Sequence, residues 1–382
     1  YGIVRLSAYN TPRFDHYPTT RESRGLLIEP ARTNQWLQSV TLAAYVTGGN
    51  LQGGVTLTDA GTSTKDPTGE YNATKMASGS GGGAHSFYKN FTSGSNGNNH
   101  TFSVWVKAAG ADHARIYVDS VGGNLGGPGV TFSTGNTWNL SASGVGTQVA
   151  TSAVEYPNGW WRLSVTGNFS NRNDFYCHVD IEGGEGDISY SGNGSNGMYL
   201  WGVQFELGGF ATSYIPTDGE SRTRGGDIAY LDGTVGTEFD DIYRTDEGTF
   251  IIDWFNNPDG NHNDGYVFTV DDGTGNNRIA AVNSNNYQVT VTSGGSSQGT
   301  RDLGSINSGA NKIAFTYKLN DQATSLNGSD ASVDTSCTLP TGVKYMWFGL
   351  RQGAYDFLGG YISRIVYYTK RLPNNQLKTL SS

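Results

Sequence analysis

Charged residues are scarce in this sequence. Asp, Glu, Lys and Arg make up 15% of the 382 residues, the formal net charge is −9, and no block of Lys or Arg stands out. A nucleic-acid surface needs a basic stripe, so this distribution excludes nucleic acid as a partner. No apolar run approaches the ~20 residues of a membrane-spanning helix, so no membrane span is expected.

Cysteine and histidine are also few. Cys177 and Cys337 fall in different predicted domains, so we expect no structural disulfide between them. The six histidines are scattered without the spacing of zinc ligands, and no P-loop, dinucleotide-binding or metalloprotease motif occurs. The chain starts at Tyr1 without an initiating Met or a signal peptide, and we expect it to be a processed or truncated piece of a longer product.

Glycine and aromatic residues are abundant instead. The sequence has 55 glycines, and aromatic residues make up 12%. Together with many Ser, Thr, Asn and Tyr residues, this composition favours short strands joined by tight turns. It lacks the Ala, Leu, Glu and Lys excess of helical proteins. The sequence therefore predicts an all-β protein.

The stretch from Met198 to Leu207 alternates as a strand with one buried face. We expect its aromatic side, which includes Trp201 and Phe205, to face the core, because burying rings removes the most apolar area from water. Gly208 and Gly209 then end the strand. The pattern indicates the closing strand of one domain and the hinge into another.

The predicted first domain spans residues 41–216, after an extended arm at 1–40 that is rich in proline. Phe102, Val104 and Val106 alternate toward one face of a strand. A Pro-Asn-Gly turn precedes Trp160 and Trp161, and only one of these two rings can face the core.

The predicted second domain spans residues 233–382, after a linker at 217–232. Short strands separated by Gly, Asn and Asp turns indicate a sandwich. Pro373 suits the first turn of a short closing helix. We therefore expect two tandem antiparallel β-sandwich (jelly-roll) domains, an extended N-terminal arm and a short C-terminal helix.

Several segments carry a family resemblance. "NTPRFDHYP" and "RGLLIEPARTN" resemble the segment that precedes a jelly roll in bacteriophage tail-fibre and virion surface proteins, and "LWGVQFELGGFATSYIPT" resembles the segment that ends it. "NKIAFTYKLNDQATSLNGS" and "GYISRIVYYTKRLPNNQLKTL" resemble a concanavalin A-like, laminin-G-type sandwich. The resemblance implies a jelly roll like those of carbohydrate-binding modules, followed by that second sandwich.

The same resemblance implies a non-enzymatic protein of the virion surface: a tail-fibre, receptor-binding or capsid-decorating subunit. Such a protein would be assembled in the host cytoplasm, sit beside other virion proteins as a homo-oligomer, with a trimer favoured, and bind glycans on a host-cell surface. Two alternatives stay open. One is a polysaccharide depolymerase, either a glycosidase or a lyase, and the other is a purely structural packing protein.

Glycan recognition requires aromatic faces beside hydrogen-bonding groups. The candidates for contact with a sugar are Trp105, Trp160, Tyr190, Trp254, Tyr287, Trp347, Arg351 and Tyr355.

Acidic loops supply candidates for a structural calcium ion, because Ca²⁺ takes oxygen ligands from Asp, Glu and Asn. One group is Asp271, Asp272, Asn276 and Asn277, and the other contains Asp180 and Glu182. Asp180 and Glu182 are also the nearest match to the paired carboxylates of a glycosidase, but Gly183 and Gly184 follow them directly. No catalytic residue is predicted.

Overall fold

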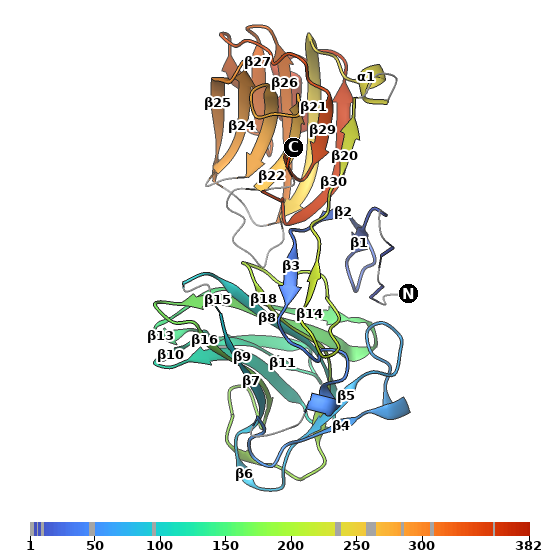
Figure 1. Cartoon of the computed structure of the whole chain (residues 1–382), viewed down its shortest axis with the longest axis vertical. Coiled ribbons are helices and arrows are strands. Elements are labelled where there is room, and N and C mark those ends of the chain that lie inside the picture. Colours follow the sequence, from blue (N-terminus) through green and yellow to red (C-terminus); the bar gives the residue numbers. More distant parts are fainter. Residues whose placement is uncertain are drawn as a thin grey trace.

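The computed structural model describes residues 4–5, 7–8, 11–45, 50–93, 97–233, 238–256, 265–283, 286–305, 309–353 and 356–382. Two β-sandwiches follow one another along the long axis of the molecule (Figure 1). The all-β prediction, with tandem antiparallel sandwiches and a short C-terminal helix, is confirmed.

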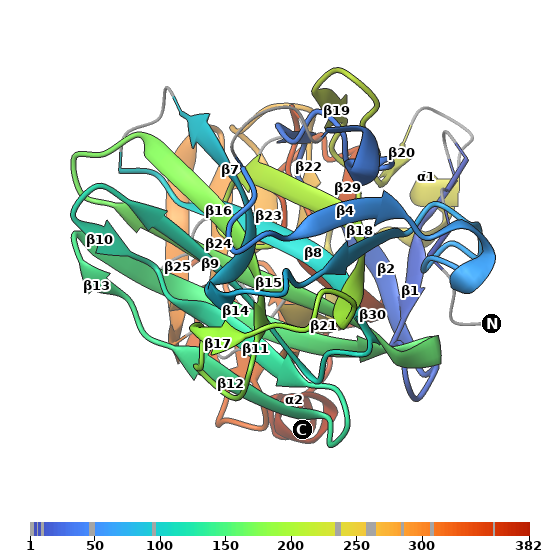
Figure 2. The same cartoon turned by 90° about the horizontal axis from the view of Figure 1, so that it is seen from below.

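The first sandwich consists of two antiparallel sheets, shown from below in Figure 2. One sheet contains β7 (His85–Thr92), β16 (Asp174–Glu182), β9 (His113–Ser120), β11 (Gly127–Thr131), β12 (Asn136–Leu140), β10 (Gly123–Asn124) and β13 (Ser143–Gly144). The other has the order β14 (Gly146–Tyr156), β15 (Trp160–Phe169), β8 (His100–Ala109), β18 (Gly197–Leu207), β5 (Thr74–Ala77), β4 (Thr56–Asp59). A short pair joins β6 (Gly82–Gly83) to β17 (Tyr190–Ser191).

The second sandwich also has two sheets. One has the order β1 (Phe14–His16), β2 (Ser23–Ile28), β30 (Gly360–Tyr368), β21 (Glu247–Asn256), β26 (Gly309–Lys318), β27 (Gln322–Leu326), β28 (Ser332–Asp334). The other has the order β20 (Tyr230–Asp232), β29 (Tyr345–Phe348), β22 (Gly265–Asp271), β23 (Arg278–Asn283), β24 (Asn286–Ser293), β25 (Ser296–Ser305). The helices are α1 (Glu238–Ile242) and α2 (Asn374–Leu380), and short 3-10 turns occur at Leu42–Tyr45, Gly61–Ser63 and Pro157–Gly159.

The N-terminal arm links the two sandwiches. Its strands β1 and β2 extend a sheet of the second sandwich, because β2 pairs with β30. Farther along, β3 (Arg32–Asn34) pairs with β19 (Arg222–Arg224) between the sandwiches. The arm is therefore held at both ends by strands that lie far from it in the sequence.

A group of charged side chains, here called the junction cluster, lies where the arm meets the connecting segment. It consists of Arg13, Glu29, Arg224 and Asp227. Glu29 accepts from Arg13 at 2.8 Å, lies 3.2 Å from Arg224 and accepts from the Ser213 N–H at 2.9 Å, while Arg13 also pairs with Asp227. Burial by itself would raise the pKa of Glu29, but the charges of Arg224 and Arg13 outweigh it and hold that pKa below its ordinary value.

Strand β18 differs from the simple alternation expected of it. A register shift lies between Trp201 and Gln204, where Gly202 adopts a φ of 64°. Phe205 therefore packs in the main core of the first sandwich, whereas Trp201 points to the opposite face, against Trp105 and Tyr214. The expectation that Trp201 and Phe205 share one core face was wrong, because a β-bulge reverses the alternation.

Candidate functional site

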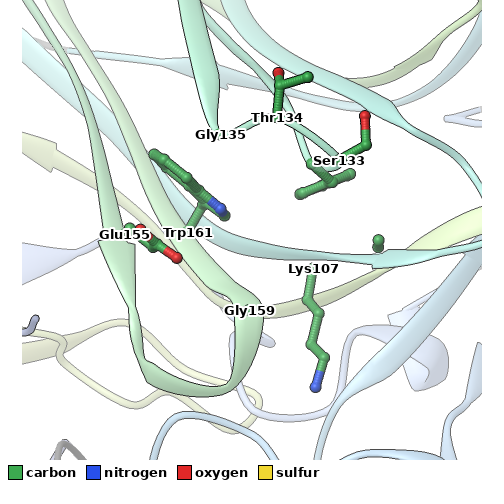
Figure 3. Close-up of a pocket in the computed structure, with 9 residues that line it drawn as sticks. Lys107, Ser133, Thr134, Gly135, Glu155, Gly159 and Trp161 are labelled. Atoms are coloured by element: carbon green, nitrogen blue, oxygen red, sulfur yellow. The ribbon is translucent and has the colours of Figure 1, made fainter.

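An open cleft lies at one end of the first sandwich (Figure 3). Its walls are the end of β8, the turn between β11 and β12, and the hairpin of β14 and β15. The hairpin turn is the Pro-Asn-Gly turn expected from the sequence, and its Asn158 has a φ of 65°. The β11–β12 turn closes through a bond from the Gly135 N–H to the Thr131 carbonyl at 2.8 Å. Two tight turns thus set the width of the cleft.

The cleft has a volume of about 380 Å³, and its lining is partly aromatic and partly polar. The side chains that line it include Lys107, Phe132, Ser133, Thr134, Glu155 and Trp161. Figure 3 shows Trp161 between Glu155 on one side and Thr134 and Ser133 on the other. A volume of this order falls in the range of small-molecule sites, ~300–1,000 Å³.

The polar groups of the cleft differ in the hydrogen bonds that they make within the protein. Ser133 donates to Asp112 at 2.7 Å, and Thr134 accepts from the Asn136 N–H at 3.2 Å. Lys107 donates to the Thr64 hydroxyl at 3.0 Å and extends away from Trp161 in Figure 3, and burial lowers the pKa of its ammonium group.

Glu155 is the charged side chain of the cleft that is available to contact a ligand. It is exposed, and its carboxylate makes no hydrogen bond or ion pair with any residue that the structure describes. A carboxylate of this kind accepts hydrogen bonds, and the neighbouring Trp161 indole, which is 8% exposed, offers a small apolar surface to the cleft. Together they suit a ligand that carries both hydroxyl groups and apolar C–H faces.

Asp180 and Glu182 lie elsewhere, on the outer face of β16. Arg115 on β9 contacts both, with its Nη2 2.9 Å from Asp180 Oδ2 and its Nε 2.9 Å from Glu182 Oε1. All three side chains are buried. Burial raises the pKa of Glu182 to about 7, although the charge of Arg115 opposes this. Neither carboxylate is among the residues that line the cleft.

The acidic turn after β22 is held together by its own bonds. Asp271 accepts from the Gly273 N–H at 2.9 Å, and Asp272 accepts from the Thr274 N–H at 2.8 Å and from the Asn277 amide at 2.9 Å. Asn276 lies in the same turn. Within the described ranges, no three His, Cys, Asp or Glu side chains are arranged to hold a metal ion. Calcium binding stays a prediction.

The candidates for sugar contact differ in burial and in their place in the fold. Four of them are buried at 1–2% exposure and have no open ring face: Trp105, Trp160, Trp254 and Tyr287. Trp254 and Tyr287 lie in the core of the second sandwich, and Trp105 and Trp160 lie in a separate cluster with Trp201 and Tyr214. These four positions are therefore not included in the proposed site.

The remaining candidates do not meet at one place. Tyr190 packs against His85 with a centroid distance of 4.6 Å. Trp347 packs against Tyr230 at 4.7 Å, and Arg351 pairs with Asp356 at 2.5 Å. Tyr355 lies outside the described residues.

The sequence interpretation missed Trp161, the tryptophan that lines the cleft. Trp161 follows Trp160 directly, and the strand alternation showed that the two rings take opposite faces. Trp160 enters the aromatic cluster with Trp105 and Trp201, where its indole donates to the Lys65 carbonyl at 2.9 Å. Trp161 packs at the edge of the main core and lines the cleft. The position of Trp161 just after the hairpin turn could have indicated this role, because a ring there lies at the end of the sandwich.

No protein-family model matches the chain, and no curated protein matches it. Among solved structures, the carbohydrate-binding module CBM40 of the Ruminococcus gnavus IT-sialidase is 20% identical and covers 41% of this chain and 93% of its own, with a TM-score of 0.34. The K499G mutant of the NanB sialidase from Streptococcus pneumoniae is 15% identical over 40% of this chain and 26% of its own, with a TM-score of 0.32. The LG1-3 region of the laminin alpha2 chain is 10% identical over 76% and 66%, with a TM-score of 0.27.

The helices within the described ranges are too short, or not apolar enough, to cross a membrane.

Proposed function

We propose that this chain is a non-enzymatic glycan-binding protein, and that its first sandwich holds a saccharide in the cleft of Trp161 and Glu155. The supporting observation is the combination in one concave surface of an indole, an unpaired carboxylate and hydroxyl groups. Sugar C–H faces pack on aromatic rings, and sugar hydroxyls donate to carboxylates. The cleft has room for one or two sugar rings.

The charge of the cleft restricts the class of saccharide that it can bind. Glu155 carries the charge that lies beside the indole, because Lys107 extends away from Trp161 and donates to the Thr64 hydroxyl, a neutral group that leaves the ammonium charge in place. A saccharide rich in carboxylate or sulfate groups would be repelled by Glu155. We therefore propose a neutral or amino sugar as the bound unit.

A glycan array followed by calorimetric titration with the best-bound saccharide tests this proposal. We expect Glu155→Gln to weaken binding by about tenfold, because an amide is a poorer acceptor for hydroxyl groups than a carboxylate. Glu70→Gln is the matched control, since Glu70 is also exposed on the first sandwich but lies away from the cleft. Equal weakening by both variants, or no binding to any saccharide, would contradict the proposal.

The same preparations distinguish binding from catalysis. Incubation with bacterial or algal polysaccharides should release neither reducing ends nor unsaturated products. Release of either product would support a depolymerase instead.

We further propose, on the sequence resemblance alone, that the protein sits on a bacteriophage virion surface as a tail-fibre, receptor-binding or capsid-decorating subunit, with other virion proteins as neighbours. Oligomeric copies would raise the avidity of a weak sugar site without new contacts. Peptide mass spectrometry of purified virions would detect the chain if this is correct.

A further inference from the structure

Strand β14 lies at the edge of its sheet and is long for an edge strand. It has 11 residues and, among the strands that the structure describes, hydrogen-bonds only to β15. None of its residues is buried, whereas most of β15 is buried. From Ala150 to Glu155, one side of β14 therefore presents its backbone N–H and C=O groups to the surroundings.

The composition of β14 gives this edge little protection. Gly146 to Val154 contains no charged residue and no proline, and Val149 and Val154 are 37% and 38% exposed. Natural edge strands are usually short, or carry lysine, proline or bulges that prevent pairing with another chain. The bulge between Gln148 and Ala150 protects only one end of β14.

Another long edge strand, β25, shows the contrast. It has 10 residues but carries Arg301 and Asp302, and its pairing with β24 contains two register shifts. Both features oppose the docking of another strand. The chain therefore protects β25 and leaves the half of β14 from Ala150 to Glu155 open.

The beginning of β14 is already occupied within the chain. The Gln148 amide donates to the carbonyls of Leu125 at 2.6 Å and Leu140 at 2.9 Å. An incoming strand would therefore meet the segment from Ala150 onward. This segment is uncharged up to Val154 and contains two residues that favour strands, Thr151 and Val154.

We propose that β14 is a self-association surface, on which a second copy of this chain pairs its own β14 in the antiparallel direction. Directly opposite residues on antiparallel strands have side chains on the same face of the sheet. A two-fold axis normal to the sheet must therefore lie midway between one residue of β14 and the same residue of the second copy. An axis at Ser152 sets Ala150 opposite Val154 of the second copy, and Thr151 opposite Ala153. No charge then faces a like charge, and the two sheets join into one continuous sheet.

A second copy is a better occupant than another edge of the same protein. The far edge of this sheet is β4, which has only four residues and carries Asp59. It cannot match the open half of β14 in length. Pairing of β14 with itself is closed, so it gives a dimer and not an open chain of subunits.

The pairing would also bring two sugar sites together, a consequence that rests on the proposed function. Glu155 lies on β14 three residues from Ser152, so the two copies of Glu155 would lie about 20 Å apart along the strand direction. A glycan chain of several units could then reach both clefts and gain avidity.

Analytical ultracentrifugation of the full chain over about 1–100 µM tests the pairing. We expect a species of twice 40.9 kDa that becomes monomeric in Ser152→Lys, which sets two lysines opposite each other at the axis, and in Val154→Lys, which places a charged side chain opposite Ala150 of the second copy. Val333→Lys is the matched control, since Val333 is 46% exposed on the edge strand β28. Circular dichroism confirms that each variant is folded.

A monomer at every concentration, a trimer, or a dimer that survives both lysine variants would overturn the proposal. If the lysine variants do not fold, hydrogen exchange on the unaltered protein decides: protection of β14 amides must rise with concentration, and unchanged protection overturns the pairing. The two proposals fail separately, because Glu155→Gln changes sugar binding per chain, whereas the lysine variants change mass.

Discussion

Glu182 is a carboxylate with a strongly perturbed environment. It is 3% exposed, lies 2.9 Å from Arg115 and accepts from the Gly186 N–H at 2.9 Å. Desolvation opposes its ionisation more than these partners favour it, and its pKa is raised to about 7. Between its ordinary pKa of 4.5 and this value, the folded state binds more protons than the unfolded state.

We therefore predict that stability conferred by neutral Glu182 is lost as pH rises from about 5 to about 7. Glu182→Gln mimics the protonated side chain, so its free energy of unfolding relative to the unaltered protein should rise over this window by about 2–3 kcal/mol. Urea unfolding at about pH 5 and about pH 7.5 measures it. A relative stability that does not change with pH would contradict the raised pKa, and Glu70→Gln serves as the control for exposed carboxylates.

Strand β2 protects an edge of the second sandwich. It covers β30, with Leu26 paired to Ile362 and Ile28 paired to Gly360. Close approach depends on Gly25, which has a φ of 101° and whose Cβ, if present, would lie 2.2 Å from the Ile362 carbonyl oxygen. The arm can therefore dock as a strand only with glycine at this position.

Gly25→Ala should displace β2 from β30 and reduce stability by about 2 kcal/mol or more, since it combines an unfavourable φ with a clash against backbone. Hydrogen exchange should accelerate in β30 but not in β15, which belongs to the other sandwich. Gly225→Ala is the control, because a Cβ there meets nothing within 4 Å. Unchanged exchange in β30 would show that β2 contributes little to this edge.

The junction cluster couples the two sandwiches within the whole molecule. Buried Glu29 is held by Arg13 from the arm and Arg224 from the connecting segment. Its lowered pKa means that its contribution to stability is present above about pH 4.5 and is lost as pH falls. Removal of one partner from a buried ion pair leaves the others uncompensated, at a cost of about 3–5 kcal/mol.

We predict that the unaltered chain unfolds in one calorimetric transition at neutral pH, and that Glu29→Gln divides it into two, one for each sandwich. The loss of stability in Glu29→Gln should shrink as pH falls below about 4.5, because protonation of Glu29 removes the charge that the variant lacks. Glu22→Gln, an exposed change in the same arm, should leave one transition. Two transitions in the unaltered protein would contradict this coupling.

Local patterns were sufficient for much of the fold. Alternation placed Phe102, Val104 and Val106 on one face, and all three lie in the main core. Pro373 directly precedes α2, as its position in the sequence indicated. These features could be predicted because side-chain periodicity and turn chemistry depend on neighbouring residues.

The sequence by itself determined an all-β chain of two sandwiches with a short closing helix. Only the tertiary structure decided which ring of the Trp160–Trp161 pair reaches the cleft, that Gly202 reverses the alternation of β18, and that Arg115 engages Asp180 and Glu182. The physical reason is the distance along the chain over which each feature is decided. The tendency to form a strand depends on adjacent residues, whereas the side chains that a strand face contacts depend on pairing with strands far away in the sequence.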